Sequence, residues 1–274
     1  MKRVATIILN RNLPEVTDRL VEHLQRHDGD ATDAFVVEAG SDPGHLSRYA
    51  TWHADWPDAR LHGLRYCRGM NHGLSQLWKE GRFERYDAFF LLTNDTELQS
   101  SPTVAPLMDI LDQHSRLGIL SPCSPRWGER LLLKSQPTKY FWFIHNNAYL
   151  LRREFIETIC NADMADPDGF LFDGSNFRGY GSESELIAKA YTNDWAAAIT
   201  ADIWASENES HLLDKADLIK TEGYEQNLSL YVEEGRHWMR KKYGFNSHWS
   251  MQQYVKSFYD HFFRFHPELE IYKV

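Results

Sequence analysis

The sequence predicts an α/β fold with a mixed, mostly parallel sheet flanked by helices and a helical C-terminal extension. Short apolar runs recur in the first three quarters of the chain, and segments with helical spacing separate them. Beyond residue 210 the chain is polar and aromatic, with helical spacing only. We therefore expect a sheet domain at residues 1–210 and a helical extension packed on it at residues 211–274.

The first strand–helix–strand unit illustrates the pattern. Residues 4–9 (VATIIL) are rich in β-branched side chains and are expected to form a strand buried on both faces. Pro14 suits the first turn of an amphipathic helix that runs to about His27. Residues 34–37 supply the next strand, so the two strands should lie parallel with a right-handed crossover.

The rest of the chain continues this alternation. Residues 88–92 (AFFLL) predict a buried strand, and Ser121 and Pro122 are expected to stop a later strand at residues 117–120. Residues 170–180, rich in Gly, Phe and Asp, are expected to form an ordered loop. The other expected elements are helices around residues 73–78, at 107–113, from 152 onward, at 183–191, 224–243 and 249–266, and a last strand at 196–203.

Composition and charge exclude several classes of protein. Hydrophobic content of 42% is enough for a packed core, and the formal charge of -9 argues against nucleic acid as a partner. No apolar segment is long enough to span a membrane, and the N-terminus becomes polar too soon for a signal peptide. Cys67, Cys123 and Cys160 are widely separated and odd in number, which indicates free thiols in a cytoplasmic protein.

The polar residues that follow the strand at 88–92 indicate a ligand site. Carboxylates just past a buried parallel strand lie at the sheet edge where open α/β folds bind ligands. Mg²⁺ and Mn²⁺ prefer carboxylate and phosphate oxygens, so Asp95 is the candidate metal ligand, with Asn94 or Glu97 as a helper. The alternative is a polar turn in which Asp95 or Thr96 caps the next helix.

Five motifs occur in order along the chain. They are VATIILNRNLPE from Val4, VVEAGSDPG from Val36, NHGL from Asn71, LLTNDTEL from Leu91 and GYGSESEL from Gly179. As a set over residues 4–205 they resemble the family-2 glycosyltransferases with the GT-A (Rossmann-like) fold. In that resemblance NHGL opens a helix, LLTNDTEL matches the metal-binding Asp-x-Asp motif, and GYGSESEL matches the segment that carries the catalytic base.

The resemblance implies a hexosyltransferase-type enzyme. It would transfer a sugar from a nucleotide-diphosphate sugar to a carbohydrate or glycolipid hydroxyl, with inversion and with Mn²⁺ or Mg²⁺, in polysaccharide biosynthesis. Glu183 is then the aligned general base, with Glu185 beside it and Asp173 as the competing residue. The remaining candidates are Asn12, Arg11, Glu38, Gly40, Arg68, Asn71 and Asn94 for the donor, Asp95, Glu97 and His211 for the metal, and Trp142, Tyr180 and Trp204 for stacking on the acceptor sugar.

Individual residues support or weaken these roles. Arg68 is a phosphate candidate because Gly69 lets backbone approach a ligand closely, and Asn71 can alternatively be a helix cap. Thr93 occupies the first position of the metal motif, and Ser182 replaces an acidic residue in the base motif.

Two other functions stay open. A catalytically degenerate scaffold that binds carbohydrate or nucleotide would explain Thr93 and Ser182. A sugar nucleotidyltransferase ranks lower, because no glycine-rich phosphate loop follows the first strand. The basic and aromatic tail around Trp238 and Lys242 is expected to pack across the domain edge; the alternative is peripheral contact with the inner face of a membrane.

Overall fold

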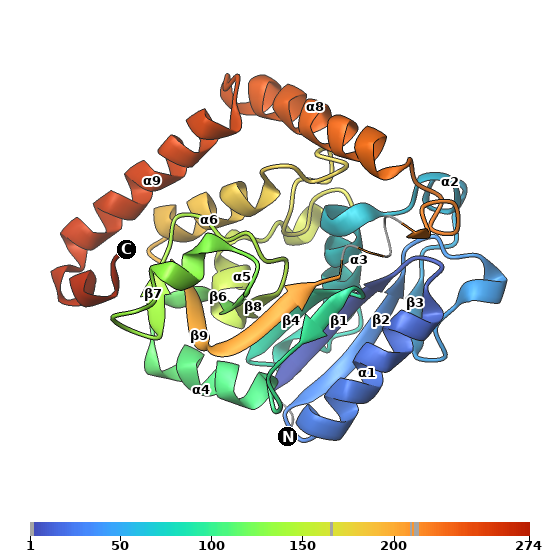
Figure 1. Cartoon of the computed structure of the whole chain (residues 1–274), viewed down its shortest axis with the longest axis horizontal. Helices are drawn as coiled ribbons and strands as arrows, with labels where there is room; N and C mark the ends of the chain where they lie inside the picture. The colour runs from blue at the N-terminus through green and yellow to red at the C-terminus, as the bar shows by residue number, and fades with distance from the viewer. Residues whose placement is uncertain (1–2, 165–166, 209, 211–213) are drawn as a thin grey trace.

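The computed structural model describes residues 3–164, 167–208, 210 and 214–274, and its centre is one sheet with helices on both faces (Figure 1). The strand order is β3-β2-β1-β4-β8-β6-β9-β5, and β7 pairs with β9. Strands β3, β2, β1 and β4 are parallel, as are β6 and β9, whereas β8, β5 and β7 pair antiparallel. The strands are β1 (Val4–Asn10), β2 (Thr32–Glu38), β3 (Ala50–His53), β4 (Ala88–Thr93), β5 (Thr96–Leu98), β6 (Leu117–Cys123), β7 (Thr138–Tyr140), β8 (Tyr149–Arg152) and β9 (Ala196–Glu207).

Helices cover both faces of the sheet. In Figure 1, α1 (Pro14–Asp28) and α4 (Val104–Gln113) lie on one face, and α3 (Arg65–Lys79), α5 (Arg153–Ile159) and α6 (Ser182–Thr192) lie on the other. The short α2 (Pro57–His62) precedes α3. The long helices α8 (Tyr224–Tyr243) and α9 (His248–Phe265) follow the last strand and extend over the side of the molecule that α6 occupies (Figure 1).

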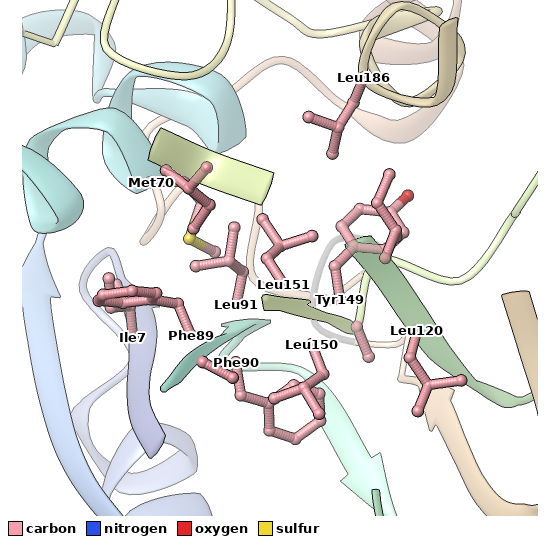
Figure 2. Close-up of a cluster of buried hydrophobic side chains, with 14 of the residues drawn as sticks. Ile7, Met70, Phe89, Phe90, Leu91, Leu120, Tyr149, Leu150, Leu151 and Leu186 are labelled. Atoms are coloured by element: carbon pink, nitrogen blue, oxygen red, sulfur yellow. The ribbon is translucent and has the colours of Figure 1, made fainter. Parts of the chain in front are cut away.

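The core lies between the sheet and these helices. Phe90 and Leu150 point to one side of the sheet, whereas Leu91, Tyr149 and Leu151 point to the other, as the twofold period of strands requires (Figure 2). All five side chains are buried. Because both faces are covered, the central strands are mostly apolar on both sides, which is the pattern that the sequence displays.

The predicted α/β fold with a mixed, mostly parallel sheet is confirmed, and two local predictions are wrong. Strand β6 continues through Pro122 to Cys123, because β8 pairs only with Ile119 and Leu120 and leaves that side of Pro122 without a neighbouring strand. Asn71 does not open or cap a helix, since it lies in the middle of α3. Strands β3, β5, β7 and β8 and helix α2 were not predicted; each is only three to six residues long.

The C-terminal helices contact the body of the protein. Val255 and Tyr259 of α9 are buried in the main core, and the Tyr259 hydroxyl lies 3.2 Å from the Tyr140 carbonyl oxygen. Trp238 of α8 is buried with Met239 and Met251. The domain boundary at residue 210 stays a prediction. None of the helices within the described residues has the length and apolar character that a membrane crossing requires.

Candidate active site

A pocket of about 270 Å³ opens at the carboxyl ends of β1 and β4. The two strands are adjacent and parallel, so they bring Asn10 and the turn that contains Asn94 and Asp95 to the same edge of the sheet. Asn94 Nδ2 donates to Asn10 Oδ1 and to Thr17 Oγ1, both at 3.1 Å, which ties this turn to β1 and α1. The polar stretch after the strand at 88–92 therefore lines a pocket, where the sequence placed a ligand site.

Of the predicted metal ligands, Asp95 lines this pocket. Glu97 lines a neighbouring pocket of about 280 Å³, which Asp95 also reaches, and accepts a 2.9 Å hydrogen bond from Asn208 Nδ2. His211 lies outside the described residues. The first position of the metal motif is Thr93, whose neutral hydroxyl lies 3.4 Å from that of Thr96.

The candidate metal ligands fit a divalent ion only together with a phosphorylated ligand. Across residues 3–164, 167–208, 210 and 214–274, no group of three His, Cys, Asp or Glu side chains is placed to hold a metal ion. Mg²⁺ commonly binds through one or two carboxylates and completes its shell with water and substrate phosphate. Asp95 in the pocket and Glu97 beside it provide that minimal set.

Two arginines line the same pocket. Arg11 follows β1 and donates to the carbonyl oxygens of Ala59 and Leu61 at 3.4 and 3.2 Å, near the end of α2. Arg65 begins α3 and donates to Thr221 Oγ1 at 2.7 Å. Within the described part of the chain, neither Nε atom has a hydrogen-bond partner although both are buried. Burial and the neighbouring Arg65 lower the pKa of Arg11 to about 10, so an anion placed between the two would be stabilised.

Residues of the C-terminal extension close one side of the pocket. Ile219, Thr221 and Asn227 line it, together with residues of the sheet edge. This segment is held by Asn12 Nδ2, which donates to the Leu218 carbonyl oxygen at 2.7 Å, and by Lys220, whose Nζ lies 2.5 Å from Asp42 Oδ1. A ligand in the pocket would therefore touch both the sheet edge and the extension.

Three residues that were predicted to bind the sugar donor lie behind the residues that line the pocket. Glu38 is fully buried and accepts hydrogen bonds from Asn10 Nδ2 and the Ser47 backbone N–H, both at 2.8 Å. Burial raises its pKa despite these bonds. Asn12 is fully buried and accepts from the Asp42 N–H at 2.7 Å. Gly40 has φ +82, and a Cβ there would collide with the Ala59 carbonyl oxygen.

Two further donor candidates point away from the pocket. Asn71 is fully buried, and its amide makes hydrogen bonds to the backbones of Pro167, Leu171 and Phe172 at 2.8–3.0 Å. Arg68 Nε lies 3.1 Å from Asp168 Oδ1. Both residues order the predicted loop at 170–180. Gly69 serves packing rather than ligand approach, because a Cβ there would lie 2.6 Å from a Leu9 methyl carbon.

The three candidate bases have different surroundings. Glu183 in the first turn of α6 is half-buried, with its Oε1 at 3.4 Å from His248 Nε2. Glu185 is buried and bonded to the Tyr243 hydroxyl and, at 2.7 Å, to Lys242 Nζ. Asp173 also binds Lys242, at 2.5 Å. Burial opposes ionisation of Asp173, but hydrogen bonds from Lys242, Ser175 and Trp238 outweigh it and hold the pKa well below its usual range. Glu183 is thus the candidate least engaged by structural partners.

Two tyrosines pack against each other beside the pocket. Tyr66 lines the pocket, and its ring centroid lies 6.3 Å from that of Tyr149, edge-on. Burial raises the pKa of Tyr149, and the neighbouring Tyr66 and the charge of Glu183 raise it further. Among the described residues, neither tyrosine hydroxyl has a hydrogen-bond partner. Both hydroxyls are therefore buried, and Tyr66 is the one of the two residues that lines the pocket.

The predicted acceptor residues separate into two groups. Trp142 is half-buried in a groove with His248, and Tyr180 contacts the His248 ring at a centroid distance of 4.8 Å, so both lie near Glu183. Trp204 is part of β9, where its backbone N–H donates to Ser100 Oγ at 3.0 Å, and it is not among the residues that line the pocket or this groove.

Sequence reasoning missed Arg65, Tyr66, Thr221 and Asn227. Arg65 and Tyr66 precede the NHGL motif by only a few residues, but their role depends on where α3 begins. Thr221 and Asn227 carry no motif, and their approach to the pocket is a tertiary contact that local pattern does not reveal.

Comparison with known proteins identifies the fold. No protein-family model matches the chain, and no curated protein matches it. Several solved structures do match. The mannosyltransferase PcManGT from Pyrobaculum calidifontis, in complex with GDP-Man and Mn²⁺, is 13% identical with a TM-score of 0.56, over 98% of this chain and 69% of that one. GalNAc-T7 with UDP, GalNAc and Mn²⁺ is 11% identical with a TM-score of 0.54, and the match covers 96% of this chain and 56% of that one. TarS of S. aureus is 11% identical with a TM-score of 0.52, and the match covers 86% of this chain and 43% of that one.

The chain therefore has the GT-A glycosyltransferase fold, as the motifs implied. It spans less than two thirds of the length of GalNAc-T7 and TarS.

Proposed function

We propose that this protein is a glycosyltransferase that moves a sugar from a nucleoside-diphosphate sugar to a hydroxyl group of a carbohydrate or glycolipid acceptor. The observation that carries the proposal is the pocket at the sheet edge, which Arg11, Arg65 and Asp95 all line. Two guanidinium groups suit a diphosphate, and one carboxylate suits a metal ion shared with it. Two of the similar structures contain a nucleotide or nucleotide sugar with Mn²⁺, which supports this assignment.

Each residue would then have a defined task. Arg11 and Arg65 bind the diphosphate and stabilise the charge that develops on it as the leaving group. Asp95, helped by Glu97, would hold Mn²⁺ or Mg²⁺, which supplies further stabilisation of the same charge when bound. Asn94 and Ala39 line the same pocket, and we assign the nucleoside to their side of it.

Glu183 would be the general base that activates the acceptor hydroxyl. A sugar hydroxyl is a very weak acid, so transfer needs a general base within hydrogen-bond reach. Direct attack by the activated hydroxyl inverts the anomeric carbon, in agreement with the mechanism that the motifs imply. The buried hydroxyl of Tyr66, which lines the pocket, can orient the transferred sugar, a hexose by the same resemblance. We place the protein in the cytoplasm, since its three cysteines are free thiols.

Calorimetric titration with UDP, GDP, dTDP and CDP, each with Mn²⁺ and with chelator, tests this proposal. We expect one nucleotide to bind selectively, and more tightly with Mn²⁺. If a folded sample binds none of the four nucleotides, the transferase proposal fails. If it binds a nucleotide equally well with metal and with chelator, the role of Asp95 fails.

A further inference from the structure

A second concave surface lies next to Glu183, on the side that faces α9. It is a groove of about 500 Å³ between residues 142–145 and the first turns of α9. Trp142, His145, His248, Trp249 and Lys256 contribute to it. We call this surface the α9 groove.

Aromatic rings form the walls of the α9 groove. The Trp249 side chain is 71% exposed, which is unusual for a residue of this size. Trp142 packs against Tyr259 with a centroid distance of 5.1 Å, and Lys256 Nζ lies 5.3 Å from the Trp142 ring centroid. The ring of His145 stacks on Trp127 at 4.9 Å. The groove thus presents aromatic rings, of which that of Trp249 is largely exposed.

Polar groups lie among these rings. Gln252 and Gln253 line the groove, and Gln252 Nε2 donates to Ser184 Oγ at 3.2 Å. The charged members are already paired, because Lys256 binds Asp260 and His145 binds Glu129, both at 2.5 Å. The α9 groove therefore combines aromatic faces with neutral hydrogen-bonding groups and little uncompensated charge.

The α9 groove also leads to Glu183. His248 lines the groove and lies 3.4 Å from Glu183 Oε1, and Gln252 is bonded to Ser184, the next residue of α6. A molecule in the groove would have one end beside this carboxylate.

We propose that the α9 groove binds a neutral oligosaccharide, the acceptor chain whose terminal hydroxyl reaches Glu183. The C–H faces of sugar rings stack on aromatic rings, while their hydroxyls take amide and imidazole hydrogen bonds, which is the combination found here. The proposal rests on the transferase function and adds to it the class of acceptor, a chain rather than a single sugar. A membrane surface is a poorer match, because the other exposed aromatic residue of α9, Phe265, lies at the opposite end of the helix.

Binding of oligosaccharides to the chain of residues 1–274 tests the proposal. The probes are cellotetraose, chitotetraose, mannotetraose and tetragalacturonate. Calorimetry measures the binding of each one. The variant is Trp249→Ala, and the matched control is Phe265→Ala, which removes an equally exposed aromatic side chain from the same helix. We expect one neutral tetrasaccharide to bind, with Trp249→Ala weakening it about tenfold or more and Phe265→Ala leaving it unchanged.

Other outcomes overturn the proposal. These are no binding of any tetrasaccharide by the wild type, binding of tetragalacturonate alone, or equal loss in both variants. Sedimentation with phosphatidylglycerol vesicles that is lost in Trp249→Ala would assign the groove to a membrane instead. Nucleotide titration of the same samples separates this proposal from the transferase function. Nucleotide binding without oligosaccharide binding refutes only the groove, and the reverse refutes only the transferase.

Discussion

Arg11 and Arg65 belong to segments far apart in the sequence, yet both line the pocket that Asp95 reaches. Arg65 contributes, after burial, to lowering the pKa of Arg11 to about 10. Arg65 also pairs with Glu222 at 3.4 Å, whereas Arg11 donates to backbone carbonyl oxygens, so an anion that joins Arg11 would offset the cost of burying its charge. Their convergence on one pocket is the structural basis for placing a diphosphate there.

Arg65→Ala should weaken the binding of the preferred nucleoside diphosphate about 10- to 100-fold, because a charge-assisted hydrogen bond contributes about 1.5–3 kcal/mol. Affinity for the corresponding nucleoside, which lacks phosphate, should change little. Arg68→Ala is the matched control, since Arg68 belongs to the same helix but pairs with Asp168. Equal losses for nucleoside and nucleotide would mean that Arg65 only holds the extension in place.

Asp95→Asn should abolish the effect of Mn²⁺ on nucleotide affinity, because an amide is a poor ligand for a hard cation. Calorimetry with Mn²⁺ and with chelator measures the effect. Glu97→Gln provides the comparison: Glu97 is exposed and lines only the neighbouring pocket, so we expect a smaller loss. Metal dependence that survives in Asp95→Asn would place the ion elsewhere.

Glu185→Gln should lower the free energy of unfolding by about 2 kcal/mol. The substitution removes the buried negative charge that pairs with Lys242 and accepts a hydrogen bond from the Tyr243 hydroxyl. Glu183→Gln should cost much less, because its carboxylate is half-buried and its His248 contact is long. Urea denaturation of both variants makes the comparison. A larger loss for Glu183→Gln would reverse the roles assigned to the two residues.

Asn71→Ala should destabilise the fold by about 3 kcal/mol, because several backbone groups of the loop at 167–172 would lose a buried partner. Asn193→Ala is a suitable control, since Asn193 is exposed and its amide donates to the carbonyl of a nearby residue. Urea denaturation again provides the measurement. Equal stability of the two variants would contradict the structural role of Asn71.

The pair Glu129–His145 should make stability depend on pH. The hydrogen bond to Glu129 raises the pKa of His145. A raised histidine pKa stabilises the fold below about pH 6.5, and this contribution is lost as the pH rises through the folded-state value. Glu129→Gln should therefore destabilise the protein more at pH 6 than at pH 9. A cost that is the same at both values would show that His145 is neutral in the pair.

The sequence predicted those parts of the fold that local pattern determines. Residues 4–9 and 88–92 are long apolar runs, and they correspond to β1 and β4. Helices α8 and α9 were placed within one or two residues of their bounds, because their spacing is regular. Short elements such as β5 are stabilised by their pairing with β9, which the sequence does not show.

The candidate site was predictable only in part, for a similar reason. The polar turn at Asn94 and Asp95 directly follows a strand, so its place at the sheet edge follows from the fold. Asn71 resembles a ligand-binding residue in its motif but faces the backbone of a loop about one hundred residues further along the chain. Such long-range contacts decide whether a polar residue meets a ligand or supports the fold.

Release of nucleoside diphosphate from a panel of nucleotide sugars is the most direct test of the central claim. The panel is UDP-glucose, UDP-N-acetylglucosamine, GDP-mannose and dTDP-glucose, with the four tetrasaccharides as acceptors. We predict that the wild type consumes one donor, and that Glu183→Gln binds this donor normally but turns it over about 10²- to 10⁴-fold more slowly. A wild-type protein that binds a nucleotide sugar but never consumes it, or a Glu183→Gln variant as active as wild type, would contradict the account.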